Sequence, residues 1–445
     1  MNCDFTIEGA AVLAMDADYS LYDPGYVAVS RGAILSAGPL AAMGDIGAPL
    51  RIDGRGCLLM PGFVNTHTHV AMAAFKGAGE DMPDRLARFL FPMEKALVER
   101  ELVRDASLFC LAEMARSGTT TFADMYYFED EVAKAARRAG LRAVLGETVV
   151  DFPAPDAPEP HGGIDYALKF IEEWSGDSLL TPCFAPHAAY TVDPAALVRV
   201  RELAERLDAP MLMHVAETEK EAARFAASHG SAVRFLDSIG LLGPRLIAAH
   251  AIYLDEADIE LLARRGAAVA HCPASNAKSG RPIAPASACI EAGVRVGLGT
   301  DGPVSGNGMD MMGVLGLYPK LQKVLRGRRD IVSCREALRA ATLGGAEALG
   351  LGSVTGSIEA GKRADLVLVD STDFNMQPVY DWYSAAVYCM RPHNVRSVWV
   401  DGRPVVDRGA IVTIDEAEVK RSMSEMAARC RGEIARLTAA ARPGK

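Results

Sequence analysis

Gly62-Phe-Val-Asn-Thr-His-Thr-His69 indicates the fold of this chain more strongly than any other stretch. It has the form of a buried strand that ends in two histidines two residues apart. Side chains at that spacing on a strand point to the same side, so both imidazoles face one point. Seven further apolar runs have the same form: residues 119–125, 142–149, 180–188, 210–217, 246–252, 267–275 and 295–301.

Helical segments separate these predicted strands. Residues 131–139, 194–207, 219–227 and 255–265 are rich in Ala, Leu, Glu and Arg and have helical periodicity. Eight strand–helix units in a chain of this size predict an α/β fold, a parallel (β/α)8 barrel of the TIM type. A doubly wound sheet is the alternative, but it usually places its site at one crossover point rather than at many strand ends.

The two ends of the chain have a different character. Residues 1–57 and 362–410 contain short strands with Gly and Asp turns, and neither segment is long enough for a stable sheet alone. We therefore expect them to form one small β-sandwich beside a barrel of residues 58–361. Residues 411–445 are rich in Ala, Glu and Arg, which predicts a C-terminal helix.

The composition excludes several classes of protein. Of the 445 residues 50% are hydrophobic and 23% charged, which excludes global disorder. The net charge of -10 and the lack of a basic run argue against nucleic-acid binding. No apolar stretch reaches the ~18 residues of a membrane span, and the N-terminus lacks the features of a signal peptide. Nine cysteines without a CxxC pair indicate reduced thiols and a cytoplasmic protein.

Polar residues gather at the ends of the predicted strands, where barrels of this kind carry out their chemistry. Most of the histidines lie there, together with one aspartate: His67, His69, His187, His214, His250, His271 and Asp301. His187 is expected to line a substrate pocket, and His271 either supports the site from behind or is a core residue. His161, His229 and His393 lie in loop or helix-end contexts and are interpreted as surface or structural residues.

The alternation of His67 and His69 places two imidazoles where they can chelate one cation. Imidazole and carboxylate ligands suit zinc, iron and related divalent ions. With His214, His250 and Asp301 at later strand ends, the sequence predicts one divalent metal ion, zinc in the first place and iron as the alternative. Asp301 follows an apolar strand, where a carboxylate is costly unless it is paired or bound to metal.

Glu217 lies three residues after His214, at the transition from strand to loop. A carboxylate beside a metal-bound water is well placed for proton transfer. The alternative is a capping role at a helix N-terminus, because Thr218 and Glu219 follow.

Taken together, these motifs resemble the amidohydrolase superfamily. Pro61-Gly-Phe-Val-Asn-Thr-His-Thr-His69, His214-Val-Ala-Glu217, His250, His271-Cys-Pro-Ala-Ser-Asn276 and Leu298-Gly-Thr-Asp-Gly302 occur in the family's order. Gly361-Lys-Arg-Ala-Asp-Leu-Val is similar to the family's returning β-sandwich, so the similarity covers residues 1–410. Within the superfamily the chain is similar to the mononuclear-metal aminohydrolases and chlorohydrolases. That branch includes the methylthioadenosine/S-adenosylhomocysteine deaminases and the triazine hydrolases.

The resemblance implies roles for individual residues. It gives four metal ligands: His67, His69, His214 and Asp301. Glu217 would pass a proton to the substrate ring nitrogen, while His250 and Asp301 would orient and deprotonate the attacking water. Metal-bound hydroxide would attack an amino-bearing ring carbon, and ammonia would leave. No lysine lies near the end of the strand at 180–188, so the carbamylated lysine that bridges two metals in related barrels is not expected.

The same resemblance suggests the substrate-binding residues. Phe91-Pro-Met-Glu94 is similar to the segment in which adenosine-type deaminases carry a glutamate that binds ribose hydroxyls, and His187 would contact the purine. The family usually carries a tryptophan shortly before this segment, whereas Arg85 stands near that place here. Arg85 either recognises an anionic or more polar substituent of the substrate or lies on a solvated helix face.

The sequence thus predicts a metal-dependent hydrolytic deaminase of an amino-substituted N-heterocycle. Adenine nucleosides with a 5′-thioether, such as methylthioadenosine or S-adenosylhomocysteine, are the first expectation. The second hypothesis is the same chemistry on another ring: a pterin, a guanine-like base or a triazine, which would lose ammonia, chloride or an alkylamine. The third hypothesis is hydrolysis of a cyclic amide. The last alternative is a non-catalytic binding protein on the same fold. Such a protein would be expected to have lost metal ligands, whereas this sequence has every ligand that the family resemblance implies. No nucleic acid or membrane partner is expected, and the apolar stretch 309–321 suits either a homo-oligomer interface or buried core.

Overall fold

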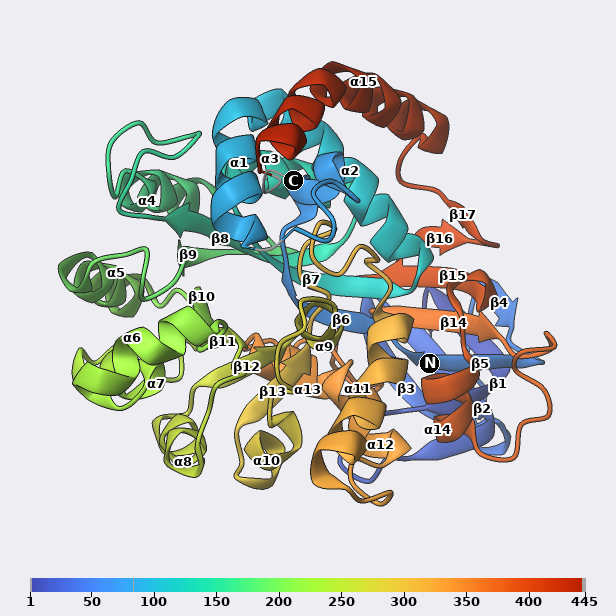
Figure 1. Ribbon diagram of the computed structural model, residues 1–445. Coiled ribbons are helices and arrows are strands. Elements are labelled where there is room, and N and C mark those ends of the chain that lie inside the picture. Colours follow the sequence, from blue (N-terminus) through green and yellow to red (C-terminus); the bar gives the residue numbers. More distant parts are fainter. Residues whose placement is uncertain (1, 83, 442–445) are drawn as a thin grey trace.

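Eight parallel strands form a barrel at the centre of the computed structural model, which describes residues 2–82 and 84–441 (Figure 1). They are β6 (Phe63–Thr68), β7 (Thr119–Tyr126), β8 (Arg142–Val149), β9 (Leu180–Pro186), β10 (Met211–Val215), β11 (Leu246–His250), β12 (Ala268–His271) and β13 (Arg295–Leu298). Each strand pairs with the next along the chain. Just past β13 the amide of Asp301 donates a hydrogen bond to the carbonyl oxygen of His67, 3.0 Å away, and nearly closes the barrel. The predicted (β/α)8 fold is confirmed.

Helices cover the outside of the barrel (Figure 1). They are α1 (Phe91–Leu97), α2 (Arg100–Arg116), α3 (Glu129–Ala139), α4 (Gly163–Trp174), α5 (Pro194–Leu207), α6 (Glu219–His229), α7 (Ala232–Ser238), α8 (Glu256–Arg265), α9 (Pro273–Lys278), α10 (Ala286–Glu291), α11 (Met311–Arg326), α12 (Cys334–Ala340) and α13 (Leu343–Ala348). Local chemistry sets their ends. The carboxylate of Asp193 accepts from two amides of the first turn of α5, and Pro194 takes the first helical position. Gly140, with φ of 77°, ends α3 in the left-handed region that favours glycine.

The strands β10, β12 and β13 end earlier than the sequence predicts. Pro273 opens α9 and ends the extended backbone after β12. Ala216 and Asp301 have φ of 51° and 61°, which no strand tolerates. The residues just beyond these three strands therefore lie at the mouth of the barrel, in loops after β10 and β13 and in α9 after β12.

A second sheet joins the two ends of the chain. Its nine strands are β1 (Phe5–Leu13), β2 (Leu21–Ser30), β3 (Ala33–Pro39), β4 (Leu50–Asp53), β5 (Cys57–Pro61), β14 (Leu366–Asp370), β15 (Val395–Val400), β16 (Arg403–Asp407) and β17 (Ala410–Ile411). The junction is the antiparallel pair of β5 and β14, and β5 straddles the domain boundary predicted at residue 57. Phe5, Leu59 and Trp399 belong to the separate apolar core of this module.

Short helical turns and one long helix complete the chain. The turns are η1 (Leu40–Ala42), η2 (Val70–Phe75), η3 (Leu86–Leu90), α14 (Trp382–Ser384), η4 (Ala385–Cys389) and η5 (Pro392–Asn394). The predicted C-terminal helix is α15 (Glu416–Ala441), which packs against α1 and α2 (Figure 1). The last part of that prediction, residues 442–445, lies outside the described residues.

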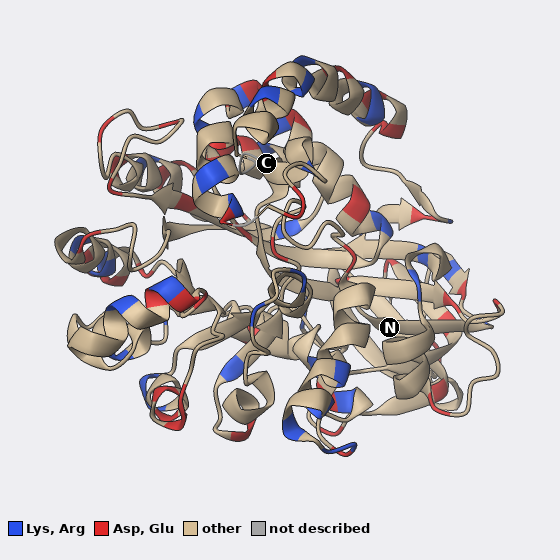
Figure 2. Ribbon diagram, viewed as in Figure 1, with Lys and Arg blue, Asp and Glu red and all other residues tan. Residues whose placement is uncertain are grey.

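Lys, Arg, Asp and Glu residues lie mainly in the outer helices and loops, whereas the barrel strands contain few of them (Figure 2). Among the described residues, no helix is both long and apolar enough to cross a membrane. Within the stretch 309–321 the side chains of Met311, Leu315 and Tyr318 are buried in the core. The structure therefore supports core rather than interface for this stretch, and an oligomer stays a prediction.

A buried ion pair fastens the barrel to the β module. Arg142, at the start of β8, donates from Nε to Asp365 Oδ2 at 2.8 Å, and the two side chains are 4% and 0% exposed. Asp365 also accepts from the amide of Asp401, 2.7 Å away, at the end of β15. One carboxylate thus ties together two segments that are distant in sequence.

Replacing Arg142 with Met is expected to lower the free energy of unfolding by about 3–5 kcal/mol, because it leaves the Asp365 charge buried without its partner. Arg199→Met is the matched control, since Arg199 and Asp165 form an exposed pair worth about 1 kcal/mol or less. Urea unfolding of the two variants measures the difference. Equal, small losses would show that the junction does not depend on this ion pair.

Candidate active site

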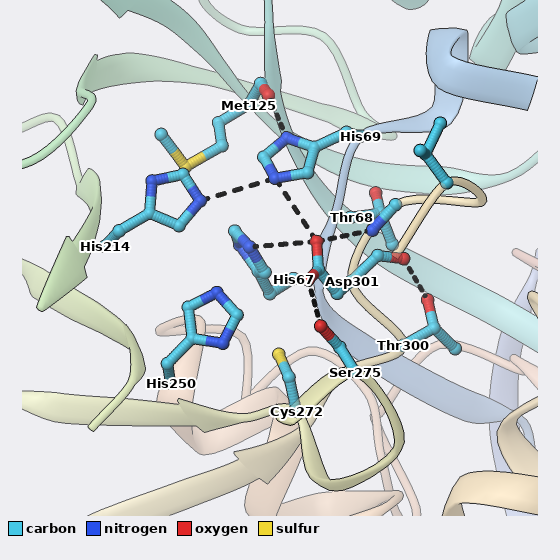
Figure 3. Close-up of polar contacts among 12 residues, drawn as sticks. His67, Thr68, His69, Met125, His214, His250, Cys272, Ser275, Thr300 and Asp301 are labelled. Carbon is cyan, nitrogen blue, oxygen red and sulfur yellow. Dashed lines mark hydrogen bonds and ion pairs between the residues drawn. The ribbon is translucent and has the colours of Figure 1, made fainter. Parts of the chain in front are cut away.

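Four histidines and one aspartate converge at the C-terminal ends of four barrel strands (Figure 3). They are His67 in β6, His69 just after it, His214 in β10, His250 at the end of β11 and Asp301 just after β13. The ring centroid of His67 lies 4.8 Å from that of His69, 5.0 Å from that of His214 and 5.3 Å from that of His250. All five side chains are buried. The structure thus brings the predicted ligands together.

Backbone carbonyls orient two of the imidazoles. Nδ1 of His69 donates to the carbonyl oxygen of Met125 at 2.6 Å, and Nδ1 of His214 donates to that of His187 at 2.8 Å. These bonds fix the tautomer, so in each ring the lone pair of Nε2 points into the cluster. Ligating histidines in metalloproteins are commonly held in this way.

Two of the separations between donor atoms match the spacing around one tetrahedral divalent ion. His69 Nε2 lies 3.3 Å from His214 Nε2 and 3.4 Å from Asp301 Oδ1. A tetrahedral zinc with bonds of ~2.0–2.1 Å separates its ligands by roughly 3.3–3.4 Å. Nε2 of His67 is buried without a hydrogen-bond partner among the described residues, which is costly unless an ion completes it. His250 also lies close enough to be considered, because His67, His214 and His250 place ligand atoms within 4.8 Å of one another.

Asp301 is held in place by its own loop. Its carboxylate accepts from the hydroxyl of Ser275 and, 2.6 Å away, from the amide of Gly302 (Figure 3). Its φ of 61° is unusual for a residue other than glycine and turns the chain sharply. This turn directs the carboxylate back toward the histidines, with Oδ1 3.9 Å from His67 Nε2.

Comparison with known proteins identifies the family. The chain matches the amidohydrolase family over residues 58–405. The chain belongs to this family. It is 40% identical over 422 residues to a 5-methylthioadenosine/S-adenosylhomocysteine deaminase of Syntrophobacter fumaroxidans, covering 94% of this chain and 96% of that protein. It is 36% identical to a 5′-deoxyadenosine deaminase of Methanosarcina acetivorans, covering 94% and 96% of the two chains.

A solved structure is similar over nearly the whole length of this amidohydrolase. It is that of an adenosine deaminase from Xanthomonas campestris with bound zinc, with a TM-score of 0.94, 36% identity and coverage of 97% of this chain and 99% of that chain. The predictions of an amidohydrolase barrel and of a hydrolytic deaminase acting on C–N bonds are confirmed. The enzyme is metal-dependent, as its family and its ligand cluster indicate.

Electrostatics keep the predicted ligands of this amidohydrolase in a form that can bind a cation. Burial and the neighbouring imidazoles hold the pKa of His67 and of His214 well below its usual value, so both rings are neutral. Burial opposes the ionisation of Asp301, but the adjacent His250, His69 and His67 hold the pKa of its carboxyl well below its usual range. Neutral imidazoles and one carboxylate are the ligand forms that metal binding requires.

Glu217 lies in the pocket wall beside this cluster. Its Oε1 is 3.5 Å from His250 Nε2 and accepts a hydrogen bond from Arg281. Burial opposes its ionisation, but the neighbouring His250 and Arg281 side chains lower the pKa of Glu217 to about 2. The capping role belongs to Thr218 instead, because its hydroxyl oxygen accepts from the amide of Glu221 at the start of α6, 3.1 Å away.

The pocket above the cluster is walled by aromatic and apolar side chains. Phe91, Tyr126 and Tyr127 line it together with the predicted substrate residues Glu94 and His187. Burial raises the pKa of Glu94 to about 7, against a lowering influence of the Tyr126 hydroxyl. Burial lowers the pKa of His187 to about 4, so this ring is neutral and bonds through Nδ1 to Thr191 Oγ1 at 2.8 Å.

Arg85 directly precedes Leu86, a residue of the pocket wall, and is bound by other residues of the protein itself. Its guanidinium donates to the carbonyl oxygen of Val304, and it lies 3.6 Å from a carboxylate oxygen of Glu80. It is largely buried rather than on a solvated helix face, with 17% of its side chain exposed. Arg85 is not one of the described residues that form the pocket wall. Its role toward the substrate stays a prediction.

Sequence reasoning did not find two residues of the site, Asn276 and Arg281. Asn276 accepts from His250 Nδ1 at 2.9 Å and so sets the tautomer of that ring. His271 is also buried, and neither of its ring nitrogens is hydrogen-bonded to a described residue. The motif His271-Cys-Pro-Ala-Ser-Asn276 signalled this region, but nothing in the sequence pointed to Arg281.

Proposed function

We propose that this amidohydrolase deaminates adenine nucleosides that carry a small uncharged or thioether group at the 5′ carbon, such as methylthioadenosine. The observation that carries the proposal is the place of Glu217 in the pocket wall, beside the ligand cluster. A carboxylate there can exchange a proton with a purine ring nitrogen. The names of the similar proteins support the substrate class, since they specify methylthioadenosine, S-adenosylhomocysteine, 5′-deoxyadenosine or adenosine.

The metal in this proposal is a single zinc ion, with iron as the alternative. It would be held by four side chains: His67, His69, His214 and Asp301. When bound, such an ion lowers the pKa of a coordinated water to roughly 7 and so provides a nucleophile at neutral pH. The zinc in the similar Xanthomonas campestris enzyme supports this choice of metal.

The remaining chemistry falls to side chains of the pocket. His250 and Asp301 orient the attacking water, and Glu217 accepts the proton that the water loses. Glu217 then delivers this proton to the ring nitrogen next to the amino-bearing carbon, which makes that carbon more electrophilic. Attack forms a tetrahedral carbon that carries the new hydroxyl and the amino group. Asp301 takes the proton of that hydroxyl and passes it to the amino nitrogen, the C–N bond breaks, and ammonia leaves as the C–O bond becomes a carbonyl.

The pocket wall favours an uncharged substrate. Its polar members include three acidic side chains, Glu94, Glu217 and Asp301, and no Lys or Arg among the residues that the structure describes. An aromatic wall suits a stacked purine and an apolar 5′ substituent. We therefore expect methylthioadenosine to react with a higher kcat/KM than S-adenosylhomocysteine, whose amino-acid group carries charges.

Glu94 is proposed to bind the ribose hydroxyls, so Glu94→Ala is expected to raise KM for nucleosides about 10- to 150-fold, the equivalent of a hydrogen bond to a charged group. Because the pKa of Glu94 is raised to about 7, the ionised acceptor form increases as the pH rises through neutrality. KM of the wild type should therefore fall from pH ~6 to pH ~8, and KM of Glu94→Gln should not. A 2′,3′-dideoxy substrate serves as the control, since it has no ribose hydroxyls for Glu94 to bind.

Ammonia release across a panel of amino-heterocycles tests the proposed function. The zinc-loaded protein is assayed with methylthioadenosine, 5′-deoxyadenosine, adenosine, S-adenosylhomocysteine, guanine, a pterin and an aminotriazine. Turnover of the uncharged 5′-substituted nucleosides is expected. Turnover of only a base, pterin or triazine would keep the mechanism and reject the substrate class. A well-metallated protein that is silent throughout would favour amide hydrolysis or a non-catalytic role.

A further inference from the structure

Arg281 reaches the proposed proton carrier from a loop outside the barrel strands. It lies between α9 and α10, and its Nη1 donates a hydrogen bond to Oε1 of Glu217. The Arg281 side chain is 23% exposed and that of Glu217 is 12% exposed, so little water competes for this contact. A charge-assisted hydrogen bond in such a place is strong and directional.

The loop that carries Arg281 is itself tied to the other partner of Glu217. The amide of Arg281 donates to the carbonyl oxygen of Asn276 at 3.1 Å, and the side chain of Asn276 accepts from His250 Nδ1. His250 Nε2 lies 3.5 Å from Oε1 of Glu217, the same oxygen that Arg281 binds. The segment after β12, made of α9 and the loop that follows it, therefore orients both groups that contact Oε1.

The two oxygens of Glu217 differ in their surroundings. Oε1 faces Arg281 and His250, whereas Oε2 accepts no hydrogen bond from any residue that the structure describes. The backbone is also held, because the amide of Glu217 donates to Glu221 Oε2 at 2.8 Å. With the backbone and one oxygen fixed, only Oε2 is left to exchange a proton.

We propose that Arg281 is a positioning residue: it holds Oε1 of Glu217 and so makes Oε2 the oxygen that carries the proton between water and the substrate ring. The inference rests on the proposed deamination and adds a residue that neither the substrate nor the metal would touch. Without Arg281 the carboxylate turns about its terminal bond, and the productive orientation is populated for a smaller fraction of time. Misplacement of a reacting group by about 1 Å costs as much as 100-fold in rate.

Arg281→Met and Arg281→Lys test this role, with Arg234→Met as the matched control. Arg234 is similarly half-buried and ion-paired to Asp255, on α7 and away from the pocket. Arg281→Met is expected to lower kcat about 10- to 100-fold with little change in KM, to retain one metal per chain, and to increase the solvent deuterium isotope effect on kcat. Arg281→Lys should recover part of the loss, and Arg234→Met should match the wild type.

A double-mutant cycle with Glu217→Gln shows whether Arg281 acts through Glu217. Arg281→Met should cause no further loss in the Glu217→Gln background, whereas an additive loss would overturn the proposal. A wild-type kcat in Arg281→Met, or a change in KM alone, would overturn it as well. If the wild type itself releases no ammonia from any substrate, the proposed function fails first and this role with it.

A crystal structure of the metal-loaded Arg281→Met variant gives a readout that does not depend on turnover. The Glu217 carboxylate should appear in more than one orientation, while the metal ligands keep their places. A single, unchanged Glu217 orientation would count against a positioning role even if the activity fell.

Discussion

Glu217→Gln is expected to lower kcat by about 100- to 10,000-fold, the usual contribution of a positioned general acid–base. Gln has the same shape and can still fill the wall of the pocket, but it cannot accept a proton from water and pass it to the ring. KM should change little, since Glu217 acts on the proton rather than on the ribose or the 5′ group. Steady-state ammonia release by metal-loaded protein measures the effect.

The control for this prediction is Glu219→Gln. Glu219 is an exposed acidic residue in the first turn of α6, two positions further along the chain, and its replacement should leave kcat at the wild-type value. Metal content should be equal in both variants and the wild type. A Glu217→Gln enzyme that kept more than about a tenth of its kcat would assign proton transfer to another group.

His67→Ala is expected to abolish both metal binding and activity. The variant removes the ligand whose Nε2 is buried without a hydrogen-bond partner among the described residues. The loss in metal affinity should exceed the ~10- to 100-fold that follows when a group behind a ligand is removed. Metal analysis after dialysis measures it directly.

Thermal unfolding gives a second measure of the same loss. An ion at about 100 times its Kd stabilises the protein that binds it by ~2.7 kcal/mol, so added zinc should raise Tm of the wild type but not of His67→Ala. His229→Ala is the control, because His229 is exposed, lies outside the cluster and hydrogen-bonds to the neighbouring Ser228. Retention of one tightly held ion by His67→Ala would remove His67 from the ligand set.

His250→Ala tests whether His250 is itself a metal ligand. Two groups of side chains place their ligand atoms within reach of one ion: His67, His214 and His250, and His67, His69 and Asp301. If His250 only orients the attacking water, this variant keeps its metal and loses its activity. If it loses the metal as well, His250 is itself a ligand and Asp301 or His69 holds the ion less tightly than proposed.

Much of this protein can be predicted from its sequence because the barrel is built from local patterns. A buried strand is marked by its apolar run, and the two-residue period of a strand places His67 and His69 on one side. Parallel strands of a barrel all end on the same face, so residues at strand ends are brought together whatever their separation in sequence. These two rules and the preferences of divalent ions predict a metal site at the strand ends. The choice of four ligands and the proton-transfer role of Glu217 come from the resemblance to the amidohydrolase superfamily.

The contacts between loops follow no such rule and depend on the folded chain. Arg281 meets Glu217 across 64 positions, and Arg142 meets Asp365 across 223. Arg85, which the sequence offers as a substrate residue, is engaged by Val304 and Glu80. Loop backbones lack a repeating hydrogen-bond pattern, so the direction of a long side chain in a loop is set only when the surrounding elements have packed. The reacting groups are thus encoded along the chain, while the residues that aim them are determined by tertiary packing.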